Sequence, residues 1–498
     1  MARSILSTQS KIPKNVFFYA FNRLLNTAAS SSAAAFTSAA STPPPPPLNL
    51  AVSPAAPTVD FSDTKALFGS LSTLEVLHAA ASLHVAAVGP VVDVGMWVMN
   101  SKLMDVELAR DVIFGTVRHS FYRHFCAGED DTAVGKTVRR LHDVGLRSML
   151  DYAIEYANDE ESCDRNLHGF LRTIEATRAL PPGSASFVVA KVSAICPLRL
   201  LERVSDLLRW QQKDPCLNLP WKLKTFPIFS ESSPLYHTLQ QPNPLTNEEQ
   251  KSLQISHQRL MKICQSCVDA NVPLAIDAEH TKIQPAIDYF TYSAAIIHNK
   301  DHNPIVYGTL QAYLKDAKDR LLLVTKEANK MRVPLGIKLV RGAYMSSESK
   351  LASSLGFESP IHNSIHDTHA CYNSCASFLL DNIAVGSSGA ILATHNVDSG
   401  KLAAKKAYEI GIEKLKEKLE FAQLYGMSEA LSYGLRNAGF QVSKYMPFGA
   451  VDMVMPYLLR RAEENRGLLS ASNLDRQLMR KELRRRMKEY LRGERRAF

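Results

Sequence analysis

From Pro181-Pro182-Gly183 onward, the chain alternates short apolar or β-branched runs with longer helical stretches. The runs are Phe187–Ile195, Leu274–Ala278, Ile305–Ala312, Leu335–Val340, Ala390–Ala393, Leu419–Leu424 and Gln441–Tyr445. Such alternation predicts parallel strands connected by helices, in either an open doubly wound sheet or a closed (βα)8 barrel. Because only seven strands are counted, the count alone leaves both folds open.

Nearly every run ends in polar or glycine residues. Polar groups at the carboxyl ends of many strands converge on one point only when the sheet closes on itself. The pattern therefore favours the barrel over the open sheet. The groups are Lys191 with Ser193, Asp277 with Glu279, Gln311 with Tyr313, Arg341 through Tyr344, Thr394 through Asn396, Tyr425 with Gly426, and Tyr445 through Gly449.

Residues 60–180 carry the spacing of helices instead, for example at Leu141, Val144, Met149 and Ala153. We therefore expect an α/β fold, a distorted (βα)8 TIM-like barrel preceded by a helical N-terminal region. The expected divisions are 1–59, a transit peptide and Pro-rich linker; 60–180, the helical region; 181–470, the barrel, with an insertion at about 209–249; and 471–498, a basic helix or tail. The apolar window Val76–Met99 predicts buried helices and not a membrane span, because it contains His78, His84, Asp93 and a Gly-Pro break.

Positive charge is concentrated at the two ends of the chain. Residues 1–59 hold four Lys or Arg and no acidic residue, which is typical of a mitochondrial or plastid transit peptide and favours the mitochondrion. A disordered tail is the alternative. Residues 473–498 hold ten Lys or Arg against four acids, as in a helix on an anionic membrane or a solvated basic helix. The remainder is nearly neutral, which argues against binding of nucleic acid.

Two cysteine pairs raise the possibility of zinc, namely Cys264 with Cys267, and Cys371 with Cys375 beside His362, His366 and His369. The first pair has the spacing of core residues on a helix, and the second is wider than the usual zinc knuckle. We therefore predict no metal site. The sequence also lacks Gly-x-Gly, so any nucleotide cofactor must be held without the usual dinucleotide fingerprint.

The segment after the last strand places Tyr457, Arg460, Arg461 and Glu464 on one helix face. Two adjacent guanidinium groups early in a helix oppose each other and the helix dipole, so an anion should compensate them. A planar carboxylate ligand would do so. A surface cluster with Glu463 and Glu464 is the alternative, and the spacing does not decide between them.

In order along the chain, these motifs resemble those of the proline dehydrogenase (proline oxidase) family, over about residues 135–470. The helical region and the insertion are most similar to the plant mitochondrial form. The matching motifs are Lys191–Ala194, Ile276–Glu279, Leu310–Tyr313, Lys338–Tyr344, Ala393–Asn396, Gln423–Met427, and Tyr445 through Tyr457–Arg461.

The resemblance implies a flavoenzyme that oxidises L-proline to 1-pyrroline-5-carboxylate, the first step of proline catabolism. FAD would accept the hydride, and ubiquinone in the inner mitochondrial membrane would accept the electrons, with the enzyme on the matrix side. No dedicated acid or base is identified. The implied substrate contacts are Lys191, Asp277, Leu424, Tyr445, Tyr457, Arg460 and Arg461. The implied FAD contacts are Gln311, Lys338, Arg341, Gly342, Ala343, Thr394, His395, Asn396, Gln423 and Glu464.

Three other functions stay open at this stage. The first is a hydroxyproline dehydrogenase of the same family. The second is a catalytically silent, membrane-associated barrel that binds a ligand, although the charges at Lys191, Asp277, Arg460 and Arg461 speak against lost activity. The third is a zinc-dependent barrel hydrolase that uses the histidines around His362.

Overall fold

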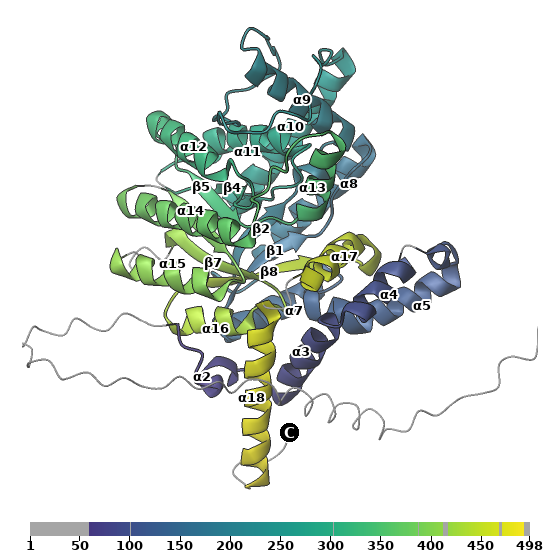
Figure 1. Cartoon of the computed structure of the whole chain (residues 1–498), viewed down its shortest axis with the longest axis vertical. Helices are drawn as coiled ribbons and strands as arrows, with labels where there is room; N and C mark the ends of the chain where they lie inside the picture. Colours follow the sequence, from purple (N-terminus) through teal and green to yellow (C-terminus); the bar gives the residue numbers. More distant parts are fainter. Residues whose placement is uncertain are drawn as a thin grey trace, which may run out of the picture. The chain divides into compact units, whose positions relative to one another are not determined.

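A computed structural model describes residues 59–99, 101–301, 303–386, 388–411, 417–467 and 471–492. Its centre is a closed barrel of eight parallel strands that pair in chain order, β1 with β2 through to β8, which closes against β1 (Figure 1). The expected barrel is therefore confirmed. The strands are β1 Arg147–Tyr152, β2 Ala185–Ala190, β3 Leu274–Ile276, β4 Val306–Gln311, β5 Gly336–Val340, β6 Gly389–Ala393, β7 Leu419–Leu424 and β8 Val442–Phe448.

At least one helix follows each strand, and most of these helices surround the barrel (Figure 1). They are α8 Glu160–Thr177 after β1; η3 Val192–Ala194, α9 Leu198–Lys213 and α10 Asn247–Asp269 after β2; α11 Gln284–His298 after β3; α12 Ala317–Met331 after β4; α13 Met345–Ser354 and α14 Ile365–Val385 after β5; α15 Val397–Glu409 after β6; α16 Glu429–Asn437 after β7; and α17 Val451–Gly467 and α18 Ala471–Leu491 after β8.

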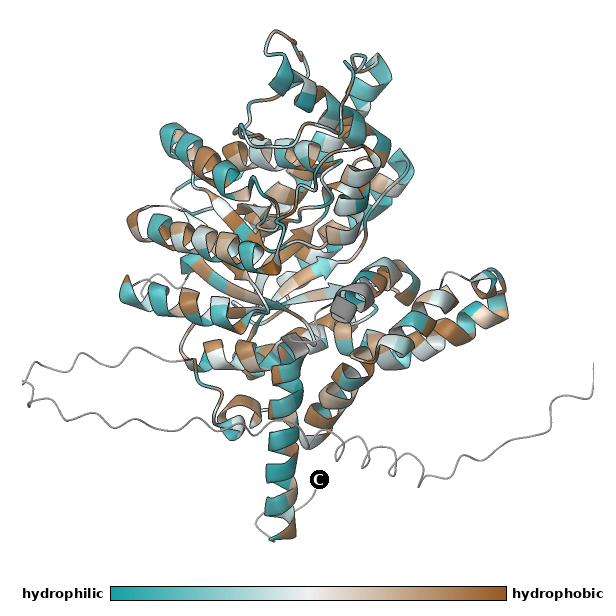
Figure 2. Cartoon of the chain, in the orientation of Figure 1, coloured by the Kyte–Doolittle hydropathy of each residue, from teal (hydrophilic) through white to brown (hydrophobic). Residues whose placement is uncertain are grey.

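A helical region precedes the barrel, as expected. Its elements are α2 Thr64–Phe68, α3 Thr73–Ala86, α4 Gly89–Met99, η1 Lys102–Asp105, α5 Glu107–Val117, η2 Arg118–Tyr122, α6 Arg123–Phe125 and α7 Asp131–Asp143. Apolar residues, brown in Figure 2, are prominent on α3, α4 and α5. Among the described helices, none is both long and apolar enough to cross a membrane.

The helical prediction is wrong for residues 147–152, which form β1. The barrel therefore begins near Arg147, ahead of the expected boundary at 181. This strand is buried in its four central residues, from Ser148 to Asp151. A short run that is buried on both faces shows no alternation, and periodicity alone does not distinguish it from part of a buried helix.

Side chains alternate between the barrel interior and the surrounding helices, as the period of two in a strand requires. Met149, Phe187, Val189 and Ala275 belong to one small interior cluster, together with Tyr307. Their neighbours along the strands, such as Leu150 and Val188, belong to the larger core beneath the helices. The interior cluster fixes which residues of each strand point inward, and so predicts where the next inward residue lies.

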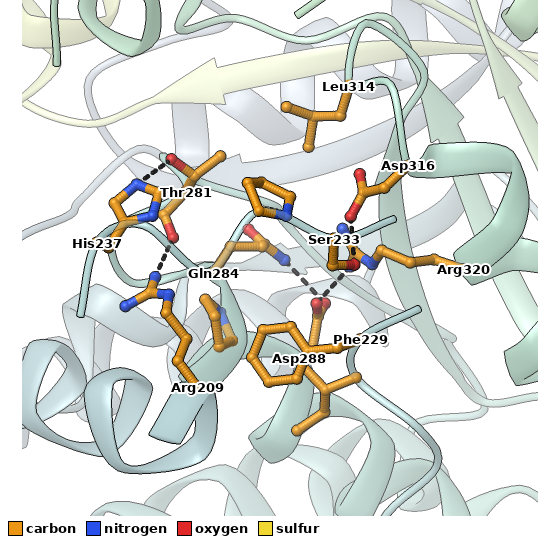
Figure 3. Close-up of a pocket in the computed structure, with 13 residues that line it drawn as sticks. Arg209, Phe229, Ser233, His237, Thr281, Gln284, Asp288, Leu314, Asp316 and Arg320 are labelled. Carbon is orange, nitrogen blue, oxygen red and sulfur yellow. Dashed lines mark hydrogen bonds and ion pairs between the residues drawn. The ribbon is translucent and has the colours of Figure 1, made fainter. Parts of the chain in front are cut away.

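The expected insertion is irregular over residues 214–246, because α9 continues to Lys213 and a capping box of Thr246 and Glu249 starts α10. Ser233 Oγ donates to Asp316 at 2.6 Å, and His237 Nε2 lies 2.8 Å from Thr281 Oγ1. The insertion thus packs over α9, α11 and the start of α12. A small pocket of about 30 Å³, partly open to solvent, lies there around the Asp288–Arg320 ion pair (Figure 3).

Candidate active site

Buried charges of both signs meet at the carboxyl ends of the barrel strands. Lys191 Nζ lies 3.0 Å from Asp151 Oδ1 and 3.2 Å from Asp277 Oδ2, and Lys338 pairs with Asp277 from the opposite side. Tyr445 donates a hydrogen bond of 2.7 Å to Asp277. We call Asp151, Lys191, Asp277, Lys338 and Tyr445 the charged cluster.

The strand period explains why these five side chains meet. Asp151, Lys191 and Asp277 each lie two residues beyond an inward residue of their strand, Met149, Val189 and Ala275 respectively. Lys338 lies between Ile337 and Leu339, both of which pack outward. Alternation therefore directs every member of the charged cluster into the barrel mouth.

The two carboxylates of the charged cluster have opposite pKa shifts. Burial opposes the charged form of Asp277, but Lys338 and Lys191 outweigh it and hold the pKa of Asp277 below its usual range. Burial, reinforced by the nearby Asp277, outweighs Lys191 and raises the pKa of Asp151. Burial also disfavours charge on Lys191, yet Asp151 and Asp277 raise the Lys191 pKa overall, so the lysine stays a cation.

Helix α17 adds a second set of charges. Arg460 binds Glu155 with both terminal nitrogens, one of them at 3.0 Å from Oε2, and its guanidinium lies 5.9 Å from the Tyr344 ring centre. The half-buried Arg461 lies 5.4 Å from the Tyr457 ring centre. Glu155 also contributes to the raised pKa of Lys191, so its charge acts on both Arg460 and the charged cluster.

An apolar wall adjoins these charges. Tyr457 is buried in a cluster with Val454, Leu458 and Met427, and Leu424 at the end of β7 packs against it. The sequence-predicted substrate contacts Lys191, Asp277 and Tyr445 therefore lie in the charged cluster, whereas Tyr457 and Leu424 line the apolar wall beside Arg460 and Arg461.

Arg341 is the centre of a separate polar network after β5. Its side chain donates to Thr394 Oγ1 at 2.6 Å, Ser399 Oγ at 2.8 Å and His369 Nδ1 at 3.2 Å. All three partners are neutral acceptors, and within the described residues no carboxylate forms an ion pair with Arg341. Burial lowers the pKa of Arg341. The site therefore presents a cation that an anionic group can still neutralise.

The other predicted cofactor residues surround this network. Asn396 caps α15 and lies 3.3 Å from His369 Nε2, and Gln423 donates to the Thr394 carbonyl. Gln311 donates to the Glu279 carbonyl at 2.9 Å. Gly342 has φ +137°, and a Cβ there would overlap the Tyr313 ring, so the turn after β5 requires glycine. Ala343 follows in the same turn.

His395 is half-buried, and its Nε2 accepts a hydrogen bond of 3.1 Å from the Leu424 backbone N–H. Burial, followed by Lys444 and Arg461, lowers the pKa of His395 to about 3. It is therefore a neutral ring whose proton is on Nδ1.

Two of the expected residues need separate comment. Lys338 was expected to contact FAD, but in this structure it pairs with Asp277 in the charged cluster. The Glu464 side chain lies outside the part of the molecule that the structure describes.

Sequence reasoning missed Asp151 and Glu155, and gave no role to Glu279. Asp151 lies in the unrecognised strand β1, and Glu155 follows it. Glu279 is fully buried and accepts hydrogen bonds from Ser193 Oγ at 2.8 Å and Ser193 N–H at 3.3 Å. The only sequence signal for a role of Glu279 in the site was its position, two residues beyond Asp277 at the end of a strand.

Burial, assisted by Glu155, raises the pKa of Glu279 from 4.5 to about 7. Since the folded state holds this proton more tightly than the unfolded state, Glu279 costs no stability below about pH 4.5. Its cost grows as the pH rises toward 7. We expect Glu279→Gln to have a higher free energy of unfolding than wild type, by a margin that grows from pH 4.5 to 7. The margin should grow by about 1.4 kcal/mol for each pH unit. Urea unfolding at several pH values measures this difference.

The exposed Glu161→Gln serves as the control and should show no such trend. A difference between wild type and Glu279→Gln that stays constant over this range would contradict the assignment.

The two cysteine pairs considered for zinc lie on helices α10 and α14. Cys264 and Cys267 are fully buried in the core beneath the helices, as their spacing predicts. Among the described residues, no group of three His, Cys, Asp or Glu is arranged to hold a metal ion.

A closed barrel with converging charges at its strand ends is the architecture of a (βα)8-barrel enzyme. A family model described as proline dehydrogenase matches residues 134–474. The chain belongs to the proline dehydrogenase family, which confirms the resemblance of its motifs.

Curated relatives agree with this assignment. The chain is 57% identical over 432 residues to proline dehydrogenase 1, mitochondrial, of Arabidopsis thaliana, covering 86% of this chain and 87% of the relative. It is 31% identical over 430 residues to hydroxyproline dehydrogenase of Bos taurus, covering 83% and 90%.

A solved structure supports the fold. Proline utilization A from Bdellovibrio bacteriovorus matches with a TM-score of 0.57 at 19% identity, covering 82% of this chain. The chain spans only 39% of that longer protein, and at this identity the likeness shows the fold alone.

Proposed function

We propose that the chain oxidises L-proline to 1-pyrroline-5-carboxylate with FAD as its cofactor. The observation that supports the proposal is that Lys191 lies in the charged cluster at the mouth of a barrel of this family, while Arg460 and Arg461 lie on α17 beside the apolar wall. Three cations beside an apolar surface suit a small amino acid that has one carboxylate and a saturated ring.

The carboxylate of proline would bind to Arg460, Arg461 and Lys191. Guanidinium groups bind carboxylates through two parallel hydrogen bonds, which fix orientation as well as position. Tyr445, Tyr457 and Leu424 would pack against the pyrrolidine ring. Asp277 would hold Lys191, Lys338 and Tyr445 in place through the contacts it already makes.

The residues around Arg341 fit FAD. The cofactor is a dinucleotide whose pyrophosphate needs a cation and hydrogen-bond donors, and Arg341 has no ion pair among the described residues. Gly342 and Ala343 bring the backbone close to this cation, and the side chains of Gln311, Thr394, His395, Asn396 and Gln423 surround the same strand ends. Lys338 and Glu464 complete the proposed FAD contacts.

Bound FAD would supply a two-electron acceptor, which no side chain offers, for the hydride on C5 of proline and pass the electrons to ubiquinone. The protein's own contribution is positioning and exclusion of water. The cations would fix the carboxylate of proline, and the apolar wall would limit how the pyrrolidine ring can turn. We assign no side chain as a dedicated acid or base.

We further propose that the enzyme acts in mitochondria, peripherally on the matrix side of the inner membrane. The Arabidopsis and other relatives are named mitochondrial. The expected transit peptide and Pro-rich linker, at residues 1–59, lie outside the described residues apart from Val59. Their support is the sequence, which has four cations and no acid there.

The function is tested by the absorption spectrum of the purified chain under anaerobic conditions. We expect the bands of oxidised flavin to be present and to bleach when L-proline is added. Colourless, folded protein that does not take up added FAD would contradict the proposal.

The same spectra distinguish proline from 4-hydroxyproline, the substrate class suggested by the 31% identical relatives. The Tyr445 ring is held by its bond to Asp277 and by Lys338, 5.0 Å from the ring centre. A fixed ring beside the substrate leaves little room for an added hydroxyl, so we expect proline to bleach the flavin faster than 4-hydroxyproline. Equal rates would contradict this role of Tyr445.

A further inference from the structure

An unusual apolar surface lies on the helical region in front of the barrel. Helix α4 exposes Val94 and Trp97, the latter 65% exposed, and α5 exposes Leu108, which is 77% exposed, and Val112. Between them η1 exposes Leu103. We call these five residues the hairpin patch, and Figure 2 shows apolar colouring on the same helices. Large exposed apolar side chains that gather on consecutive helices of one region indicate an interaction site.

We propose that the hairpin patch is a membrane-docking surface that inserts into the boundary between lipid headgroups and acyl chains. This inference rests on the proposed function, because an enzyme that delivers electrons to a membrane-dissolved acceptor must work at a lipid surface.

The shape of the hairpin fits shallow insertion. Helices α4 and α5 each have 11 residues, which is about half of what a membrane span requires. A helix with an exposed apolar face and a polar opposite face can lie in the plane of the interface, with the apolar face buried at the headgroup boundary. Tryptophan is the side chain most typical of that depth, because its ring is both apolar and a hydrogen-bond donor.

Charge indicates how the hairpin patch would bind. Residues 89–117 contain Asp93, Asp105, Glu107 and Asp111 against only Lys102 and Arg110. An anionic lipid surface would not attract this segment, so burial of apolar side chains must supply the affinity. Binding should therefore need no anionic lipid and should resist salt, in contrast to a basic helix such as α18.

The hairpin patch also adjoins the active site. Helix α17, which carries Tyr457, Arg460 and Arg461, packs against both α4 and α5. Met99, Phe114 and Val117 pack on the same apolar cluster that contains Tyr457. A hairpin lying in the membrane surface would thus place this wall of the active site next to the lipid.

Vesicle flotation of the full chain tests the proposal. We expect wild type to bind vesicles of phosphatidylcholine alone, with little change between low and high salt. The double variant Trp97→Ser, Leu108→Ser should bind at least about tenfold more weakly, since two large apolar side chains no longer enter the lipid. Both residues are exposed, so activity with a water-soluble dye as electron acceptor should be unchanged.

Matched controls locate the effect. Leu239→Ser removes an apolar side chain that is 61% exposed on the insertion, and should bind like wild type. Arg484→Gln with Lys488→Gln removes exposed cations of α18, and should also leave binding to neutral vesicles unchanged.

Three results would overturn the proposal. They are no binding to neutral vesicles, binding that requires anionic lipid and is lost in the α18 variant, and a hairpin patch that instead holds two copies together. The last would appear as a wild-type dimer and a monomeric Trp97→Ser, Leu108→Ser variant with unaltered vesicle binding. If wild type does not oxidise proline with the dye as acceptor, the proposed function is contradicted. Vesicle flotation does not depend on that activity, so it still tests the membrane-docking proposal.

Discussion

Lys191→Met is expected to lower the free energy of unfolding by about 3–5 kcal/mol, the usual cost of removing one partner from a buried ion pair. Lys191 is buried and balances Asp151 from one side and Asp277 from the other. Asp277 retains Lys338 in the variant, but Asp151 loses its only ion-pair partner among the described residues. The loss is measured by urea unfolding at pH 7.

A second substitution separates the ion pair from packing. Asp151→Asn in the Lys191→Met background removes the unpaired charge while keeping the shape, so the double variant should recover part of the lost stability. A double-mutant cycle gives the coupling between the two residues. If the double variant is no more stable than Lys191→Met, the pairing of Lys191 with Asp151 does not explain the loss.

The same pair of residues shows what the sequence could reveal about the site. Lys191, Asp277 and Tyr445 were identified because they follow recognisable strands and match family motifs. Asp151 was not identified, because the sequence pattern of its strand resembles that of a buried helix. Once β1 is known, alternation from Met149 places Asp151 inside the barrel directly.

The residue pattern alone also did not predict that the barrel closes. Seven strands were recognisable, and the eighth was supplied only by the resemblance to a family. The structure shows that β1 pairs with both β2 and β8, so the missed strand is the one that closes the sheet.

Pairings between distant residues could not be predicted from spacing. The sequence indicated that an anion should compensate Arg460. It left two candidates for that anion, a carboxylate ligand and the nearby glutamates Glu463 and Glu464. The structure gives Glu155, which lies 305 residues earlier in the chain. Such a partner is apparent only when the first strand is known to neighbour the last.

That pairing leads to a contrast between two adjacent arginines. Arg461→Met is expected to raise the KM for proline by about 10- to 150-fold, which corresponds to the 1.5–3 kcal/mol of a hydrogen bond to a charged group. Stability should change little, because Arg461 is only half-buried. Arg460→Met should raise the KM as well, but it should also destabilise the protein, since Glu155, 7% exposed, would keep a buried charge without its partner.

Steady-state kinetics with a soluble acceptor and thermal unfolding of both variants measure the two effects, with the exposed Arg165→Met as control. An unchanged KM in Arg461→Met would remove Arg461 from the carboxylate site, and equal stability of the two variants would remove the structural role of the Arg460–Glu155 pair.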